Sequence, residues 1–208
     1  MTMPALADSA TGVRVYLIRH GQTEWSLSGQ HTGRSDIPLT EQGEEEARGL
    51  AAWLRPIQFT RILTSPRQRA QRTCALASVD TLAEVEPDLA EWDYGDYEGK
   101  RSVDIRRDRP GWNVFRDGCP GGEMPADIAV RADRMIARLE TMKGVVALFS
   151  HGQFGMALGA RWIGLQVLQG QHFTLSTASV SVLGRHPTRP EVRVIEFWNT
   201  TSGSLGSG

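Results

Sequence analysis

Residues Val13–Thr23, V-R-V-Y-L-I-R-H-G-Q-T, combine a short apolar run with an abruptly polar end. The run contains β-branched residues and is typical of a strand buried in a parallel sheet. It ends in Arg19, His20 and Gly21, and in open α/β sheets ligands bind outside the carboxyl ends of the strands. An arginine offers planar donors that suit phosphate or carboxylate, and a neutral histidine beside it can attack phosphorus. We therefore expect an anion site here, with Gly21 letting a ligand approach the backbone.

The same pattern returns near residue 150. The apolar run Val145–Phe149 is followed by Ser150, His151, Gly152 and Gln153. A lone histidine at a strand end is more often structural than catalytic. Two of them, however, would meet if their strands were parallel neighbours, because the carboxyl ends of such strands lie together. We expect His20 and His151 to share one site.

Predicted strands and helices alternate along the rest of the chain. Thr40 is a plausible N-cap for one helix, and Ser65, with Pro66 at the first helical position, for another. Further helices are predicted over about 100–109, 125–142 and 155–168, and further strands over 59–64, 176–183 and 191–198. The alternation predicts a three-layer α/β fold with a mainly parallel central sheet and helices on both faces. We expect one domain, 13–199, between a flexible leader, 1–12, and a flexible tail, 200–208.

Three arginines, Arg67, Arg69 and Arg72, stand at the start of the helix that follows Ser65. Cations this early oppose the helix dipole, unless an anion lies at that helix start. Residues two apart on a helix face different ways, so at least one of the three is expected to be solvated. In the polar loop 24–38, Thr32-Gly33 can present a hydroxyl and a backbone N–H to an anion, although an ordinary turn explains them equally well.

An acidic and aromatic stretch, V-E-P-D-L-A-E-W-D-Y-G-D-Y-E, spans residues 85–98. A carboxyl held against apolar rings has its pKa raised towards the range useful for proton donation. The candidates for such a group are Glu91, Asp93, Asp96 and Glu98. Most acids in such a loop are expected to be solvated.

The composition is that of an ordinary globular protein, with 40% hydrophobic residues and a net charge of −1. No basic surface for nucleic acid follows from this balance, and no apolar stretch is long enough to cross a bilayer. Cys74 and Cys119 form neither a disulfide framework nor a C-x-x-C pair, which favours a reducing, cytoplasmic setting. We therefore expect a cytoplasmic protein with neither nucleic-acid nor membrane partners, and the sequence leaves open whether it forms a homodimer.

Four segments together resemble the histidine phosphatase superfamily, the phosphoglycerate mutase-like proteins. They are L-I-R-H-G-Q-T-E-W at 17–25, L-T-S-P-R-Q-R-A at 63–70, E-W-D-Y-G-D-Y-E-G at 91–99 and S-H-G at 150–152. They occur in the family's order and cover most of the chain. The stretch 23–33 looks most like the short phosphatases of the superfamily, which include broad-specificity acid phosphatases and a sedoheptulose bisphosphatase branch.

This resemblance implies a phosphoglycerate mutase-like fold and a role for each matching residue. His20 would be the nucleophile that forms a phosphohistidine, and Glu91 the general acid and later the base for water. The phosphoryl group would be surrounded by Arg19, Arg69 and His151. The substrate would also contact Thr23, Thr32, Gly33 and Gly152. The resemblance implies neither a metal nor another cofactor, and its expected partner is a small phosphate ester, a sugar phosphate or phospho-acid.

Two departures from the family's mutases favour hydrolysis. Ser26 stands where mutases commonly have asparagine, and only about 60 residues separate Glu91 from His151, where cofactor-dependent mutases carry a longer insertion. A cofactor-dependent phosphoglycerate mutase and a non-catalytic phospho-ligand binding protein remain the alternatives. We also expect the loop 112–122 to act as a lid or substrate wall. The remaining candidates for phosphate contact are Arg106, Arg107 and Arg116, while His31 is expected to be a surface loop residue.

Overall fold

The computed structural model describes residues 12–77 and 82–201. The predicted leader, 1–12, and tail, 200–208, lie almost wholly outside the described residues, so both stay predictions.

A six-stranded sheet forms the middle of the molecule, in the order β3-β2-β4-β1-β5-β6. The strands are β1 (Val13–Arg19), β2 (Arg61–Thr64), β3 (Glu84–Val85), β4 (Gly144–Ser150), β5 (Val180–His186) and β6 (Arg189–Thr200). The first four strands in chain order are parallel to one another, whereas β5 is antiparallel to both β1 and β6. The prediction of a mainly parallel sheet is therefore confirmed.

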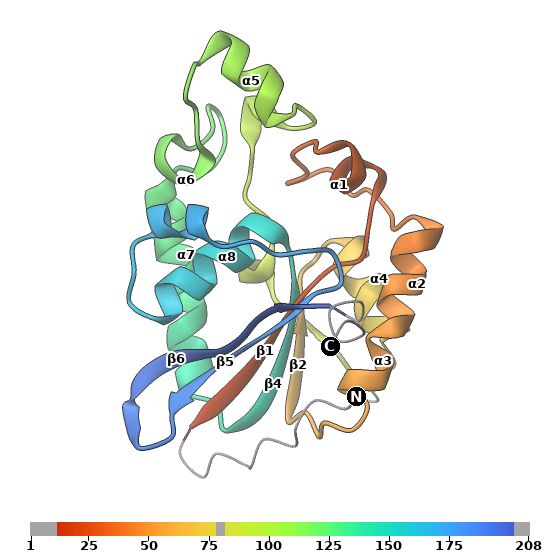
Figure 1. Ribbon diagram of the computed structural model, residues 1–208, viewed down its shortest axis with the longest axis vertical. Helices are drawn as coiled ribbons and strands as arrows, with labels where there is room; N and C mark the ends of the chain where they lie inside the picture. Colours follow the sequence, from red (N-terminus) through yellow and green to blue (C-terminus); the bar gives the residue numbers. More distant parts are fainter. Residues whose placement is uncertain (1–11, 78–81, 202–208) are drawn as a thin grey trace, which may run out of the picture.

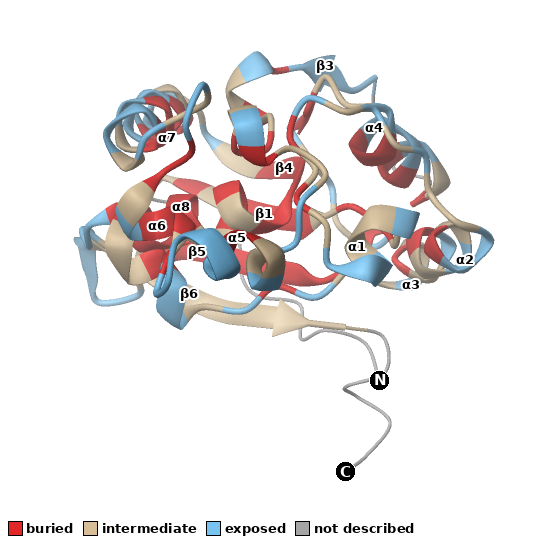
Figure 2. Cartoon of the chain, turned by 90° about the horizontal axis from the view of Figure 1, so that it is seen from above, coloured by how far each residue is buried: buried red, intermediate tan, exposed pale blue. Residues whose placement is uncertain are grey.

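Helices cover both faces of this sheet (Figure 1). One face carries α7 (Pro125–Glu140) and α8 (Gly152–Trp162), and the other carries α2 (Glu41–Gly49), α3 (Ala51–Leu54) and α4 (Gln68–Leu76). Side chains of β1 alternate between the two layers, since successive strand residues point to opposite faces. Leu17 belongs to the first core and Ile18 to the second. Burying side chains of this size contributes about 2 kcal/mol each, and Figure 2 shows the buried residues concentrated in these central elements.

A cap lies above the carboxyl ends of the strands (Figure 1). We use this name for residues 86–124, which include η1 (Pro87–Leu89), η2 (Gly95–Tyr97), α5 (Ser102–Asp108) and α6 (Val114–Asp117). Its aromatic rings hold it together: Trp112 packs edge-on against Tyr97, and Phe115 packs edge-on against Trp92. The predicted loop 112–122 thus contains a short helix and buried side chains.

Several helices have other boundaries in the structure than the sequence predicts. Thr40 is the predicted N-cap, and its hydroxyl accepts a hydrogen bond from Gly43 N. Ser65 is not an N-cap, because the helix begins only at Gln68 and the Ser65 hydroxyl is engaged elsewhere. The helix predicted over 155–168 runs from Gly152 to Trp162, and η3 (Val167–His172) follows as a separate element. Within the polar loop 24–38, the segment Glu24–Ser28 forms the short helix α1.

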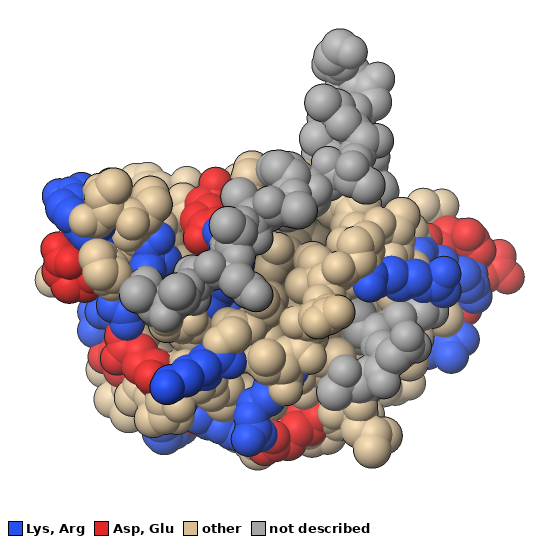
Figure 3. Space-filling view, turned by 90° about the horizontal axis from the view of Figure 1, so that it is seen from below, with Lys and Arg blue, Asp and Glu red and all other residues tan. Residues whose placement is uncertain are grey.

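Charged side chains of both signs are intermixed on one face of the molecule (Figure 3). On the face drawn in Figure 3, Lys and Arg side chains are interspersed with Asp and Glu. Among residues 12–77 and 82–201, no helix is both long and apolar enough to span a membrane.

Candidate active site

The two histidines predicted to meet do so at the carboxyl edge of the sheet. β1 and β4 pair in parallel with Arg19 opposite Ser150, so the next residue of each strand is a histidine. The ring centroids of His20 and His151 lie 5.2 Å apart, with an angle of 61° between the ring planes. Both histidines are buried. Parallel register alone therefore explains why two distant His-Gly pairs form one site.

The backbone of His20 is held from two sides. Its N–H donates to Ser150 O at 3.0 Å, and its carbonyl accepts from Ala178 N at 3.1 Å. The ring atom Nδ1 lies 2.7 Å from Gly21 O. A carbonyl only accepts, so we assign the proton to Nδ1, which leaves the lone pair of Nε2 free to act as a nucleophile. Burial, followed by the charges of Arg69 and Arg19, holds the pKa of His20 well below its usual range, so its ring is neutral near pH 7.

Gly21 serves packing between segments. A Cβ built on it would lie 2.3 Å from Gly43 O, in the first turns of α2. Its N–H donates to Thr73 Oγ1 of α4 at 3.0 Å. The space beside its Cα where a side chain would stand is thus filled by α2, and the approach of a ligand to the Gly21 backbone stays a prediction.

Arg19 is half-buried beside the start of α8. Its Nη1 donates to Leu175 O at 2.5 Å, whereas its buried Nε has no acceptor among the described residues. A Cβ on Gly152 would lie 3.4 Å from the guanidinium carbon of Arg19, so the backbone at the start of α8 packs directly against this arginine. Burial lowers the pKa of Arg19 and the nearby charge of Glu91 raises it.

Arg69 and His151 form a second, fully buried pair. Arg69 Nε donates to His151 Nδ1 at 3.2 Å, so Nδ1 must be the unprotonated nitrogen. The proton of His151 therefore sits on Nε2, which lies 2.7 Å from Ser65 Oγ. Burial lowers the pKa of Arg69 to about 10, so it stays charged near pH 7. Burial and the charge of Arg69 hold the pKa of His151 well below its usual range.

Glu91 lies against the first turn of α8. Its Oε1 accepts from Trp92 N at 2.9 Å and Phe154 N at 2.7 Å, and its Oε2 accepts from Gln153 N at 3.0 Å. A helix N-terminus favours an acidic side chain. The sequence predicts an environment of apolar rings, but backbone amides are the groups that contact the carboxylate.

Three predicted substrate contacts have protein partners instead. Thr23 is buried and caps α1, with its Oγ1 accepting from Ser26 N at 3.1 Å. Thr32 Oγ1 donates to Gln30 O at 3.2 Å. Gly33 N donates to the carboxylate of Glu98 at 2.9 Å. The structure gives these groups local roles, and a substrate contact by them stays a prediction.

The remaining acidic and basic candidates are engaged within the protein. Asp93 pairs with Arg34, and the exposed Arg72 pairs with Glu44 at the surface. Arg106 Nε donates to Trp112 O. Two further arginines of the cap, Arg107 and Arg116, pair with Asp104 and Asp117. Asp96 contributes its backbone N–H to Pro120 O. A contact between the cap arginines and a second phosphate stays a prediction.

His31 is not the surface residue that the sequence predicts. It is buried, stacks on Tyr94 at 4.5 Å between ring centroids, and packs edge-on against Trp112. Its Nε2 lies 3.1 Å from Ser102 Oγ. Burial lowers the pKa of His31 to about 4. The loop folds under the cap, which a local polar sequence does not reveal.

Two further arginines lie at the site: Arg131, to which the sequence assigned no role, and Arg67, one of the three arginines that the sequence places at a helix start. Arg131 is buried on the inner face of α7, and its Nη1 donates to Ala90 O at 2.6 Å, which holds the segment that carries Glu91. Its position three residues after Ile128, on the apolar face, was the available signal. Arg67 is half-buried, its Nε has no acceptor among the described residues, and its charge helps lower the pKa of His151.

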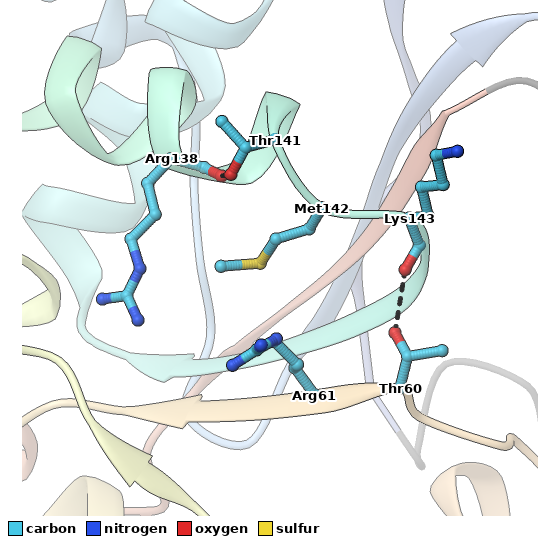
Figure 4. Close-up of a pocket in the computed structure, with 6 residues that line it drawn as sticks. All are labelled: Thr60, Arg61, Arg138, Thr141, Met142 and Lys143. Carbon is cyan, nitrogen blue, oxygen red and sulfur yellow. Dashed lines mark hydrogen bonds between the residues drawn. The ribbon is translucent and has the colours of Figure 1, made fainter.

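A separate groove of about 390 Å³ lies at the opposite end of the sheet (Figure 4). It is lined by Thr60, Arg61, Arg138, Thr141, Met142 and Lys143. Arg61 pairs with Glu84, and Arg138 pairs with Glu84 and Glu86. These acids offset the arginine charges, so the two arginines of the groove belong to a surface ion-pair network. Across residues 12–77 and 82–201, no cluster of three or more His, Cys, Asp or Glu side chains is arranged to hold a metal ion.

Comparison with known proteins agrees with this geometry. Residues 15–199 match the histidine phosphatase superfamily (branch 1), and the chain belongs to this family. An acid phosphatase from Mycobacterium tuberculosis is 41% identical over 175 residues, which cover 82% of this chain and 86% of the relative. Sedoheptulose 1,7-bisphosphatase from Saccharomyces cerevisiae is 37% identical over 198 residues, covering 79% and 71% of the two chains.

A solved structure extends the likeness to the fold. The structure of the open reading frame Rv3214 from Mycobacterium tuberculosis superposes with a TM-score of 0.84 and 35% identity, covering 90% of this chain and 97% of that one. The family and the phosphoglycerate mutase-like fold expected from the four motifs are confirmed. The protein is a phosphatase of the histidine phosphatase superfamily.

Proposed function

We propose that this protein hydrolyses small phosphate monoesters, sugar phosphates or phospho-acids, through a phosphohistidine on His20 and without a metal ion. The observation that carries the proposal is the hydrogen bond between His20 Nδ1 and Gly21 O, which leaves Nε2 unprotonated beside two arginines. A neutral imidazole with one free lone pair is the form that attacks phosphorus.

In the first step, Nε2 of His20 forms a bond to phosphorus while the bond from phosphorus to the ester oxygen breaks. Arg19 and Arg69 offset the negative charge on the phosphoryl oxygens, and His151 joins them when its Nε2–H turns from Ser65 Oγ to a phosphoryl oxygen. Glu91 gives its proton to the departing oxygen. A carboxylate has about four acceptor sites, and the three amide contacts leave one of them, on Oε2, to carry that proton.

In the second step, water attacks the phosphorus of phospho-His20. Glu91 takes up a proton from the water, the bond between Nε2 and phosphorus breaks, and inorganic phosphate leaves. The enzyme returns to its starting state with Glu91 protonated and His20 neutral, so every atom and proton is accounted for without a co-reactant.

The substrate class is supported by the relatives, whose names are an acid phosphatase and a sedoheptulose 1,7-bisphosphatase. Both act on phosphate esters, and the bisphosphatase acts on a phosphorylated sugar. Contacts of Thr23, Thr32, Gly33 and Gly152 with such a substrate, a cytoplasmic location and the open question of a homodimer stay predictions.

The test is phosphate release from sugar phosphates, phosphoglycerates and p-nitrophenyl phosphate with EDTA present, for the wild type and His20→Ala. We expect release by the wild type only. Interconversion of phosphoglycerates after priming with a bisphosphoglycerate, without release, would make the protein a mutase. Tight binding of esters without any turnover would make it a binding protein.

A further inference from the structure

The loop Thr32–Ser35 lies between an acidic and a basic side chain that do not touch each other. On one side, Glu98 Oε1 accepts from Gly33 N at 2.9 Å and from Ser35 N at 3.0 Å. On the other side, Arg69 Nη2 donates to Thr32 O and Nη1 donates to Ser35 O, both at 2.9 Å. The loop therefore presents its amides to Glu98 and its carbonyls to Arg69.

One peptide group carries both contacts. The carbonyl of Thr32 and the N–H of Gly33 belong to the same peptide unit, and in a trans peptide they point in opposite directions. A carboxylate on the N–H and a guanidinium on the carbonyl polarise that unit in the same sense, so each contact strengthens the other. Glu98 and Arg69 thus stabilise one another's orientation through the backbone between them.

Glycine at position 33 is what permits this arrangement. A Cβ built there would lie 2.4 Å from Trp92 O and 2.9 Å from Glu98 Oε2. Any side chain would collide with the Trp92 backbone and also press on the carboxylate. The requirement for glycine is therefore explained first by the approach of the Trp92 carbonyl and second by that of Glu98.

Arg69 passes this orientation on to the catalytic histidine pair. Two of its nitrogens are held by the loop carbonyls, which leaves its Nε directed at His151 Nδ1 at 3.2 Å. That contact keeps the His151 proton on Nε2. A chain of hydrogen bonds thus connects Glu98, through the loop and Arg69, to the His151 ring. The centroid of that ring lies 5.2 Å from that of His20.

We propose that Glu98 is a positioning residue for the reaction at His20, which it serves by holding the 32–35 loop that orients Arg69 and His151. The inference rests on the proposed function of that site. Glu98 is not assigned a proton-transfer role, because its contacts run to the amides of the 32–35 loop. Glu91, in the same acidic stretch, instead accepts from the amides of the first turn of α8, directly after His151.

The test compares Glu98→Ala and Glu98→Gln with the wild type and with Glu45→Gln, an exposed surface control. Oε1 accepts from both amides, and Oε2 shares only that of Gly33, so the single amide oxygen of glutamine can keep the two hydrogen bonds while alanine loses them. We expect Glu98→Ala to lower kcat about 10–100-fold with little change in KM, as loss of a supporting contact does. Glu98→Gln is expected to restore most of that loss, and Glu45→Gln to match the wild type.

Leaving-group dependence separates positioning from acid catalysis. A positioning residue affects p-nitrophenyl phosphate and sugar phosphates to the same extent, whereas loss of a general acid affects the poorer leaving group far more. A selective loss with sugar phosphates in Glu98→Ala would overturn the proposal, as would an unchanged kcat in a folded variant.

A readout without turnover keeps this test independent of the proposed function. The ¹⁵N shifts of the His151 ring report which nitrogen carries the proton. We expect Nε2–H in the wild type and in Glu98→Gln, and a mixture of tautomers in Glu98→Ala. An unchanged tautomer in Glu98→Ala would contradict the positioning role even if the wild type proved inactive. If Glu98→Ala does not fold, Glu98→Asp replaces it, because a side chain one carbon shorter cannot keep both amide contacts; an unchanged His151 tautomer in that variant would overturn the proposal.

Discussion

The end of β1 and the end of β4 carry the same short motif, a buried strand followed by His-Gly, yet the two histidines differ in what holds them. At the end of β1, the ring of His20 makes its hydrogen bond through Nδ1, to the carbonyl of the next residue, and its Nε2 has no hydrogen-bond partner among the described residues. At the end of β4, both ring nitrogens of His151 are engaged, by Arg69 and Ser65. One ring keeps a free lone pair, and the other keeps a fixed N–H. Neighbours from other segments, and not the motif itself, therefore decide which histidine can be a nucleophile.

The largest effects should follow from removing each histidine in turn. We expect His20→Ala to lower phosphate release at least about 10⁴-fold, because the covalent route is lost. We expect His151→Ala to lower it only about 10²–10³-fold, because one charge-stabilising donor is lost while the nucleophile remains. Initial rates with p-nitrophenyl phosphate measure both. Equal losses from the two substitutions would show that the histidines do not have the different roles proposed here.

Replacing Glu91 tests the proposed general acid, whose carboxylate is held by the first turn of α8, directly after β4. Glu91→Gln keeps the acceptor for some of the amides of α8 but cannot carry the proton. We expect a loss of about 10²–10⁴-fold with sugar phosphates and a much smaller loss with p-nitrophenyl phosphate, whose leaving group needs no proton. The ratio of the two rates is the measurement. A uniform loss with both substrates would assign Glu91 a structural role.

A smaller effect is expected from Ser65, whose hydroxyl contacts the β4 histidine and also accepts from Arg67 N at 3.2 Å. Ser65→Ala removes the hydrogen bond to His151 Nε2, worth about 1 kcal/mol, so kcat should fall about fivefold. Ser102→Ala is the matched control, since it removes the similar serine–histidine contact at His31, away from the catalytic pair. Equal effects of the two substitutions would argue against a specific role for Ser65.

Buried neutral histidines should also make stability depend on pH. Burial lowers the pKa of His31 to about 4, whereas an unfolded histidine titrates near 6.5. Between these values the unfolded chain binds more protons, so stability falls as the pH falls, by about 3 kcal/mol for this residue. His20 and His151 act in the same direction.

Urea unfolding at pH 7 and pH 4.5 measures that dependence. We expect His31→Gln to lessen the loss of stability between the two pH values, and the exposed control His172→Gln to leave it unchanged. A pH dependence that is the same in His31→Gln and the wild type would contradict the assignment.

What the sequence predicts well here is what depends on neighbours along the chain. The apolar run before Arg19, its repetition before His151 and the Thr40 cap were all predicted from local pattern, and the parallel pairing of β1 and β4 followed from them. The four motifs added the family. These features need no knowledge of which distant segments touch.

What the sequence does not reveal depends on contacts between distant segments. Ser65 is a residue type that commonly caps helices, but its hydroxyl contacts a histidine 86 residues away. Gly33 is a residue type typical of turns, but its N–H donates to the carboxylate of Glu98, 65 residues away. His31 lies in a polar loop, but aromatic residues of the cap bury it. In each case the local pattern is present in the sequence, but a contact with a distant segment gives the residue a different role from the one predicted.

The most direct test of the different roles of the two strand ends is to trap the covalent intermediate. A phosphate ester labelled at phosphorus is mixed with excess enzyme, quenched in alkali, in which phosphohistidine survives, and the labelled peptide is sequenced. We predict one label, on Nε2 of His20, absent in His20→Ala and retained in His151→Ala. A label on His151, or turnover in a single cycle without any labelled histidine, would contradict the assignment of His20 as the nucleophile.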